Sequence, residues 1–191
     1  MGRIQTGPES AGSEPGPACY QQGGIRPAIT DADVILGKID PDNFAGGAIR
    51  LSVRLATEAV ARDVGARLSM DAEAAAFGIC EVVDENMANA ARIHAVENGK
   101  NISDNVMIAF GGAAPLHGAR LCEKLGIDQC LIPQSAGVGS AIIAREVMTP
   151  GDMIHGPAVV VERETSTVIT SPFDCVMQAD GALLLLRKGT K

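Results

Sequence analysis

Two adjacent glycines, Gly111 and Gly112, separate an apolar run from a proline-containing segment in the stretch VMIAFGGAAPLHGARL, residues 106–121. This order predicts a buried strand, a tight turn and a helix. Because glycine lacks a Cβ and a helix N-terminus favours anions, such a turn brings backbone N–H groups close to a phosphate. The turn lacks the lysine and hydroxyl of a Walker A loop and the spacing of a dinucleotide fingerprint, so a purely structural tight turn stays open.

The histidines differ in what they could do. His117 follows Pro115 by two residues, so it falls in the first turn of the predicted helix, near the glycines. An imidazole there could donate to a phosphate or transfer a proton, although a packed or capping histidine fits the position equally well. His94 and His155 stand alone in the sequence. Because no cluster of His, Cys and carboxylate has ligand spacing, we predict no metal site.

Several other polar residues have both a functional and a structural interpretation. Glu85, Asn86 and Arg92 lie on a long predicted helix, where they could line a cleft or belong to an ordinary solvated face. Asp31 and Asp33 flank a helix start, and capping is their expected role. Cys19 has no assignable histidine partner, so a buried or idle cysteine is favoured over a catalytic thiol.

Helices are expected in the first half of the chain. Thr30 and Asp33 form a capping signature before a short apolar run that ends near Gly37. Ser52 could cap a helix over residues 51–68, and Asp71 could cap a long alanine-rich helix over residues 72–99. The glycine at the end of that segment is a typical helix stop.

The second half alternates between strand and helix patterns. Residues 105–110 form a continuous apolar run, which predicts a strand buried on both faces of a parallel sheet. A helix over 115–126, a strand over 129–133 and a helix over 139–147 are expected to follow, as in a layered α/β domain. Beyond Thr149, four short apolar runs predict a small antiparallel β unit.

Composition restricts the class of protein. The chain has 191 residues, 46% of them hydrophobic and 20% charged, with a formal net charge of -7. These values fit a soluble globular protein and argue against nucleic-acid binding through a broad basic face. Five cysteines without a C-x-x-C pair favour a reduced compartment. With no signal peptide and no run of spanning length, we expect a cytoplasmic protein that does not bind membranes.

Four motifs occur in a characteristic order. They are GPESAGSEPGPACYQQGG, TDADVILGKIDPDNFAGG, AFGGAAPLHGARLCEKLGI and GPAVVVERETSTVI. In this order the chain resembles the C-terminal part of the hydantoinase A/oxoprolinase family, which includes the ATP-dependent subunits of acetone and acetophenone carboxylases. The resemblance extends over nearly the whole chain and is far more specific than the glycine pair alone.

The resemblance implies the C-terminal lobe of an actin-like fold, of the sugar-kinase, actin and heat-shock ATPase type, followed by a small antiparallel β unit. The implied segments are an irregular stretch 1–29, the α/β lobe 30–148 and the β unit 149–191. In such folds ATP with Mg²⁺ lies between two lobes, and a Gly-Gly turn holds the adenosine side. The nucleotide-binding residues implied here are Gly111, Gly112, Ala113, Ala114, His117, Glu85 and Asn86.

Departures from the family pattern limit what the chain is expected to do. Ala114 replaces a glycine that the family commonly has. Family members also begin with an Asp-Gly-Gly-Thr-like phosphate loop, usually carry a glycine-rich segment before GPESAG, and contain a long stretch where this chain passes from Val147 to Thr149. Since phosphoryl transfer needs both walls of the cleft, this chain is not expected to act alone.

Two hypotheses follow from the partial site. In the first, the chain is a short subunit of an ATP-dependent carboxylase or of a hydantoinase/oxoprolinase complex, with larger subunits as partners and a ketone or a cyclic amide as substrate. In the second, it is a non-catalytic scaffold that has lost nucleotide contact. A free-standing small-molecule binder is a third possibility, which requires a monomer that binds a ligand by itself.

Overall fold

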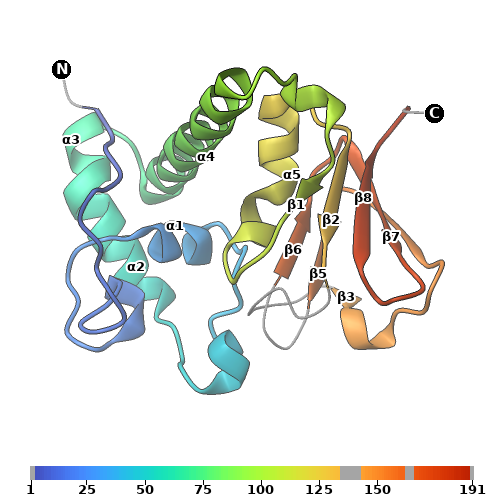
Figure 1. Cartoon of the computed structure of the whole chain (residues 1–191). Helices are drawn as coiled ribbons and strands as arrows, with labels where there is room; N and C mark the ends of the chain where they lie inside the picture. The colour runs from blue at the N-terminus through green and yellow to red at the C-terminus, as the bar shows by residue number, and fades with distance from the viewer. Residues whose placement is uncertain (1–2, 134–142, 162–165, 190–191) are drawn as a thin grey trace. The chain divides into compact units, whose positions relative to one another are not determined.

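The computed structural model describes residues 3–133, 143–161 and 166–189, and the chain forms two compact units, 1–83 and 84–191 (Figure 1). We call them the N-terminal unit and the C-terminal unit and describe each separately. The expected segments 1–29, 30–148 and 149–191 stay a prediction about domain organisation. No helix among the described residues is long and apolar enough to cross a membrane.

The N-terminal unit is helical, as predicted. Ser52 caps α2 by accepting a hydrogen bond from the Leu55 N–H at 3.2 Å, and Asp71 accepts one from the Ala74 N–H at 2.7 Å before α4. Its helical elements are a 3₁₀ turn Ala18–Tyr20, α1 Ile29–Ile35, a 3₁₀ turn Phe44–Gly47, α2 Val53–Val60, a π-helical turn Ala61–Gly65, α3 Ala66–Leu68 and the first part of α4 Ala72–Glu97.

The cap of α1 differs from the predicted one. Ala28, rather than Thr30, is the N-cap residue, and its N–H donates to the Asp31 carboxylate at 2.7 Å. The capping role expected for Asp31 is therefore confirmed, while the Thr30–Asp33 signature is wrong. Small side chains let α1, α2 and α4 pack closely around one core. This core contains Ala32, Val60, Ala75, Ala76, Ile79 and Cys80.

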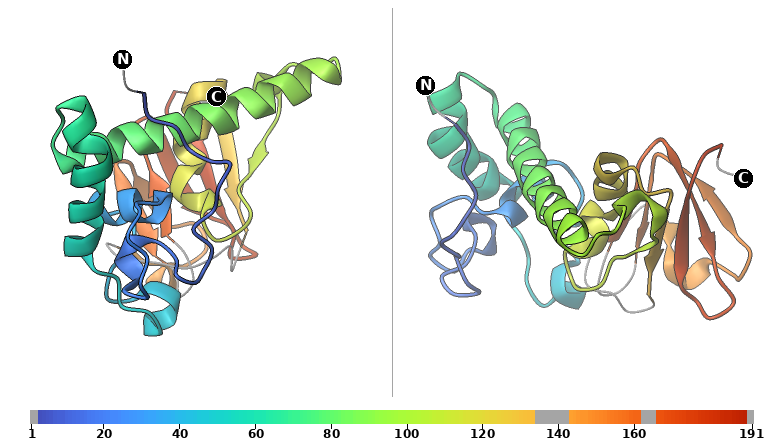
Figure 2. Two further views of the ribbon diagram at one scale, coloured as in Figure 1. Left: turned by 90° about the vertical axis from the view of Figure 1, so that its left-hand side faces the viewer. Right: turned by 45° about the horizontal axis from the view of Figure 1, so that its top comes forward.

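The long helix α4 has the predicted start and end. It runs continuously through the boundary between the units, as both views in Figure 2 show in green. The chain leaves the helix at Gly99, whose φ of +63° is the left-handed conformation that ends many helices. Residues 84–97 of α4 belong to the C-terminal unit.

The C-terminal unit contains two sheets and one further long helix. The five-stranded sheet has the order β1-β2-β8-β7-β4, and the three-stranded sheet has the order β3-β5-β6. The elements are a 3₁₀ turn Ile102–Asp104, β1 Met107–Ile108, α5 Ala114–Leu125, β2 Gln129–Ile132, β3 Ile143–Ala144, a 3₁₀ turn Arg145–Val147, β4 Met153–His155, β5 Ala158–Val161, β6 Ser166–Ile169, β7 Phe173–Met177 and β8 Leu183–Arg187.

The α/β class is confirmed, but the sheet is mixed rather than parallel. β1 and β2 are parallel, as the strand–helix–strand pattern predicts, whereas β8 pairs with β2 antiparallel. Strands β4, β7 and β8 from the C-terminal segment thus share one sheet with β1 and β2. The helix predicted over 139–147 is wrong where the structure describes it, because residues 143–144 pair with β5 and residues 145–147 form a 3₁₀ turn. Residues 139–142 lie outside the described residues.

One hydrophobic core lies between α5 and the sheets of the C-terminal unit. Strand residues alternate across the sheet, so every second side chain of β2, β7 and β8 enters this core. Its largest fully buried members are Phe173, Ile132, Ile169, Leu183, Leu185 and Val160. The core fixes the position of α5, and with it the turn that precedes the helix.

Candidate functional site

The glycine turn lies between β1 and α5, as predicted, and its backbone is open on one side. Gly111 has a φ of +108°, a conformation that side chains rarely adopt. A Cβ placed on Gly111 or Gly112 would meet no atom within 4 Å. The N-cap of α5, Ala113, provides no side-chain acceptor for the first N–H groups of the helix. Another group can therefore approach these amides closely.

His117 lies in the first turn of α5, but its ring is buried rather than directed at solvent. Its side chain is 4% exposed, and its Nδ1 lies 2.7 Å from Oδ1 of Asp84 on α4. The pair anchors the N-terminal part of α5 to α4. In this arrangement His117 holds the helix that follows the glycines, and it does not itself line an open surface.

Glu85 and Asn86 follow Asp84 on α4, and Glu85 lies against the other end of α5. Its carboxylate accepts hydrogen bonds from Arg92 at 2.9 Å and from Lys124 at 3.0 Å. These bonds lower the pKa of Glu85 below its usual value. Lys124 is seven residues beyond His117, about 10 Å along the helix axis. The structure therefore places Glu85 away from the glycine turn, while Asn86 is exposed on α4.

Asp84 is the residue that sequence reasoning left out of the site. The available signal is spacing, because Cys80, Asp84 and Ala88 occur at intervals of four and occupy one stripe of α4. All three residues are buried, and Asp84 is 2% exposed. An acid on an apolar stripe requires a buried partner. The sequence could not identify that partner as His117, which is 33 residues away.

Two buried carboxylates organise the N-terminal unit. Asp31 is fully buried and accepts hydrogen bonds from the N–H groups of Cys19 at 2.7 Å, Ala28 at 2.7 Å and Ala18 at 3.3 Å. Asp33 accepts hydrogen bonds from Lys38 Nζ at 2.9 Å and from the Cys80 thiol at 3.3 Å. These contacts tie the motif around Cys19 to α1 and give both aspartates a structural role.

All five cysteines are free and buried. Burial, together with the negative charge of Asp31, raises the pKa of Cys19. Burial also raises the pKa of Cys80 and that of Cys175 to about 12. Because the thiolate is the reactive form, these residues are poor nucleophiles near neutral pH. The buried interpretation of Cys19 fits its environment better than a catalytic thiol.

Thiol titration at pH 7 tests this conclusion. We expect native protein to contain no thiol that reacts rapidly with Ellman's reagent, because all five thiols are buried. The same protein in denaturant should titrate five thiols. A single thiol in the native protein that reacts as fast as the denatured ones would contradict the assignment.

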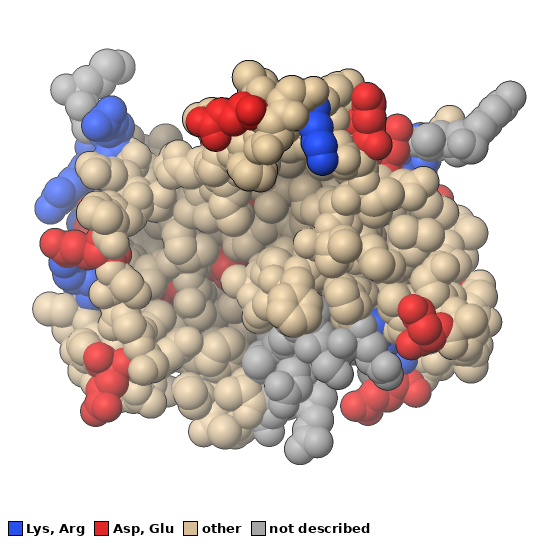
Figure 3. Space-filling view, viewed as in Figure 1, with Lys and Arg blue, Asp and Glu red and all other residues tan. Residues whose placement is uncertain are grey.

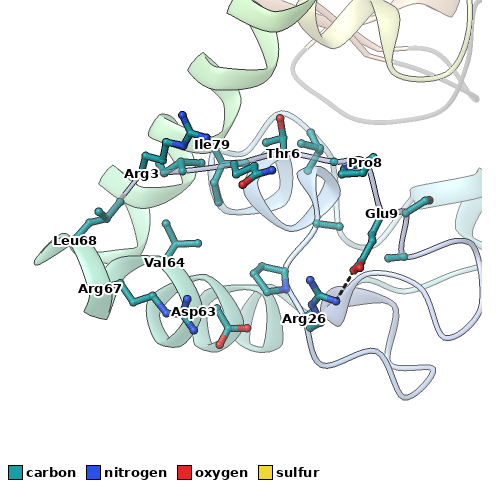
Figure 4. A pocket seen from close by; sticks show the side chains of 18 residues that line it. Arg3, Thr6, Pro8, Glu9, Arg26, Asp63, Val64, Arg67, Leu68 and Ile79 are labelled. Carbon is teal, nitrogen blue, oxygen red and sulfur yellow. Dashed lines mark hydrogen bonds and ion pairs between the residues drawn. The ribbon is translucent and has the colours of Figure 1, made fainter. Parts of the chain in front are cut away.

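A separate open hollow of about 970 Å³ lies in the N-terminal unit between residues 3–11 and the helices (Figure 4). Its charged side chains have both signs, and Arg26 is bonded to Glu9 at 2.9 Å. A hydrogen bond from Arg62 lowers the pKa of Asp63, which also lines the hollow. None of the predicted nucleotide-site residues lies there, so the hollow is a second, unassigned feature.

The described residues contain no group of three or more His, Cys, Asp and Glu side chains that could hold a metal ion. Two carboxylates of α4 that contact α5 are already bonded, Asp84 to His117 and Glu85 to Arg92 and Lys124. What the turn offers is backbone N–H groups at a helix start, which suit an anionic ligand.

Comparison with known proteins gives the family. The family model described as hydantoinase/oxoprolinase matches residues 1–144. The chain belongs to the hydantoinase/oxoprolinase family. The match includes α5 and the glycine turn, so the family resemblance inferred from the four motifs is confirmed.

Relatives with named activities include subunits of larger enzymes. The chain is 44% identical over 145 residues to the acetophenone carboxylase gamma subunit of Aromatoleum aromaticum, covering 74% of this chain and 20% of that protein. It is 39% identical over 136 residues to the caprolactamase subunit alpha of Pseudomonas jessenii, covering 71% and 20%. The chain thus spans about a fifth of the length of these hydantoinase/oxoprolinase relatives.

A solved structure shares the fold. The nucleotide-free structure of acetone carboxylase, from work on ATP-dependent acetone carboxylation, matches with a TM-score of 0.88 at 15% identity. The match covers 97% of this chain and 50% of that chain. At this level of identity the likeness establishes the fold of this family member and leaves its ligands open.

Proposed function

We propose that this hydantoinase/oxoprolinase family chain forms one wall of an ATP site in a multi-subunit carboxylase or cyclic-amide hydrolase. The open backbone of Gly111 and Gly112 at the uncapped start of α5 carries the proposal. A fold of the actin-like ATPase type would place the adenosine side of the nucleotide at this turn. The names of the relatives, acetophenone carboxylase gamma subunit and caprolactamase subunit alpha, support a role within a larger enzyme.

The proposed wall consists of backbone rather than charged side chains. Gly111, Gly112, Ala113 and Ala114 would approach the nucleotide, and His117, held by Asp84, would keep α5 in place behind them. The Cβ of Ala114 replaces a hydrogen at a position where the family commonly has glycine. In this proposal Glu85 and Asn86 lie outside the nucleotide wall, and the Glu85 carboxylate ties α4 to α5.

The turn fits one side of a nucleotide but lacks what the phosphates and Mg²⁺ require. An ATP-dependent step needs charge neutralisation at the γ-phosphate, usually by a metal ion and basic groups. Near the turn, Asp84 is already bonded to His117. We therefore assign the phosphate-binding groups, the Mg²⁺ ligands and the site for a ketone or cyclic amide to larger companion subunits.

Substitution of Gly112 is the cleanest test of the nucleotide wall. Gly112 lies outside the left-handed region, and a Cβ there meets no atom within 4 Å, so Gly112→Val should fold normally. Its side chain would project into the space proposed for the nucleotide. We expect the affinity of the complex for ATP, measured by isothermal titration, to fall about tenfold or more.

The matched control adds a β-branched side chain elsewhere in the C-terminal unit. Ser171 is exposed in the turn between β6 and β7, and Ser171→Val should leave ATP affinity unchanged. Gly111→Val is less informative, because the φ of +108° at Gly111 makes any side chain strained. Equal ATP affinities in the Gly112→Val complex and the native complex would support a non-catalytic scaffold instead.

The scaffold is the second candidate function, and one observation favours it. Ile108 and Phe110, next to the glycine turn, are 64% and 78% exposed. Exposed apolar side chains beside a loop are typical of protein interfaces. A scaffold needs such an interface and no nucleotide contact, so the nucleotide titration separates the two functions.

A further inference from the structure

The exposed side chains of β1 follow the alternation of a strand. Val106, Ile108 and Phe110 are 52%, 64% and 78% exposed, whereas Met107 and Ala109 face the core of the C-terminal unit. The sequence predicted a strand buried on both faces, and the structure covers only one of them. Phe110 is one of four phenylalanines in the chain, which makes its exposure more notable. The second face of β1 therefore has the composition of a buried surface without a covering element among the described residues.

An apolar row continues across the whole five-stranded sheet on this face, while the next row on the same face is polar at Gln129, Asp174 and His155. One row of residues in register crosses all five strands: Ile108, Leu131, Leu184, Val176 and Met153. The two ends of the row, Ile108 and Met153, are 64% and 56% exposed. Figures 1 and 2 show α5 on the opposite face of the sheet. Figure 3, in the orientation of Figure 1, shows a broad area without Lys, Arg, Asp or Glu over β1, β2 and β8.

The backbone of β1 has a free edge beside this face. The Ala109 N–H donates to the Leu131 carbonyl of β2 at 2.9 Å. Because successive residues of a strand point their N–H and C=O groups in opposite directions, those of Ile108 point away from β2. No strand among the described residues pairs on that side. The free edge can therefore accept a further strand.

Apart from its short length of two strand residues, this edge lacks the usual protection against pairing. Natural edge strands carry charges, prolines or bulges that discourage association with other chains. Residues 106–110 contain no charged residue and no proline. An uncharged, apolar edge with its face exposed is typical of a strand that pairs with another segment in the assembled protein.

We propose that an extended apolar segment of a larger companion subunit pairs with the free edge of β1 and covers Val106, Ile108 and Phe110. The proposal rests on the proposed function, in which such a subunit completes the nucleotide site. The match covers 50% of the solved chain of the same fold, so that chain contains polypeptide that this one lacks and that a companion subunit would have to supply. Since β1 leads directly into Gly111, a strand at this edge brings the companion to the glycine turn.

The occupant is a companion subunit rather than a second copy of this chain. Pairing of two β1 edges would bury the same short segment twice and would bring two identical glycine turns together, each still without an opposite wall. A companion segment with alternating apolar side chains can match both the backbone of the edge and the side chains beside it. Phe110 of this chain would be the aromatic anchor of the interface.

The test uses the complex assembled from this chain and the larger subunits of the proposed enzyme. In the variant Ile108→Lys the charge lies at an exposed position, so the isolated chain should keep its melting temperature within about 2 °C. Assembly, measured by surface plasmon resonance with the purified larger subunits, should weaken about tenfold or more. The control is Val147→Lys, at a residue of the same unit that is 74% exposed, and it should assemble normally.

Hydrogen exchange gives a second, independent measurement. The Ile108 amide should exchange rapidly in the isolated chain and become protected in the complex, because the new strand supplies its acceptor. Unchanged exchange at Ile108, native assembly of Ile108→Lys, or failure of the native chain to bind the larger subunits would overturn the proposal. Protection that arises from self-association of the isolated chain would also overturn it, in favour of a second copy.

The two proposals fail separately. Assembly is measured without nucleotide, so it reports on the β1 edge alone. If Ile108→Lys disrupts assembly while Gly112→Val leaves ATP affinity unchanged, the edge proposal stands and the nucleotide wall fails. If Gly112→Val weakens ATP binding while Ile108→Lys assembles normally, the nucleotide wall stands and the edge proposal fails.

Discussion

Replacement of Asp31 by alanine is expected to destabilise the N-terminal unit by roughly 2–6 kcal/mol, since each of the two buried donors, the N–H groups of Ala18 and Cys19, costs about 1–3 kcal/mol when it is left without an acceptor. Asp31 is fully buried and accepts three backbone N–H groups, from Ala18, Cys19 and Ala28. Because the carboxylate is fully buried, its former donors would have no ready substitute acceptor. The loss should affect the whole turn that precedes α1.

Tyr20 provides a local probe for this experiment. It is the only tyrosine of a chain without tryptophan, it follows Cys19, and its ring lies 5.6 Å from that of Phe44. Urea unfolding followed by tyrosine fluorescence therefore reports on the N-terminal unit. The control Asp42→Ala removes an exposed ion pair with Arg50 and should cost less than about 1 kcal/mol. Similar losses in the two variants would contradict the role of Asp31.

Replacement of Asp84 by alanine is expected to destabilise the C-terminal unit by roughly 2–4 kcal/mol, because it removes the buried carboxylate that is bonded to the ring of His117. Asp84 and His117 are 2% and 3% exposed, and their side chains are 2.7 Å apart. Loss of the Asp84–His117 contact should loosen the N-terminal half of α5. The helix would then hold the glycine turn less firmly. Hydrogen exchange of α5 amides measures this effect directly.

Asp84→Asn separates hydrogen bonding from charge. An asparagine carbonyl can still accept a hydrogen bond from Nδ1, so this variant should recover part of the stability lost in Asp84→Ala. Glu97→Ala, at an exposed position of the same helix, should stay within about 0.5 kcal/mol of the native protein. Native exchange rates in α5 of Asp84→Ala would show that the pair does not anchor this helix.

Local signals predicted most of the helices of this family member. Ser52 and Asp71 act through backbone N–H groups only three residues away, and Gly99 ends α4 through its own backbone conformation. Such features depend on neighbouring residues, which a sequence displays directly. The α/β pattern from β1 to β2 was predictable for the same reason, as was the position of the glycine turn.

Long-range contacts explain what could not be predicted. The antiparallel pairing of β8 with β2 joins residues more than 50 positions apart. The apolar run 105–110 predicted two buried faces, but nothing in the run shows which polypeptide covers the second. His117 carries no sign that its partner is Asp84 rather than a ligand. The predicted nucleotide-binding role of Gly111 and Gly112 likewise depends on groups outside the sequence pattern.

ATP titration is the most direct test of the central claim, that this chain supplies only one wall of a nucleotide site. The account predicts ATP binding by the native complex, affinity about tenfold or more lower in the Gly112→Val complex, and neither binding nor hydrolysis by the isolated chain. Hydrolysis of ATP by the isolated chain, or equal affinity in the native and Gly112→Val complexes, would contradict it.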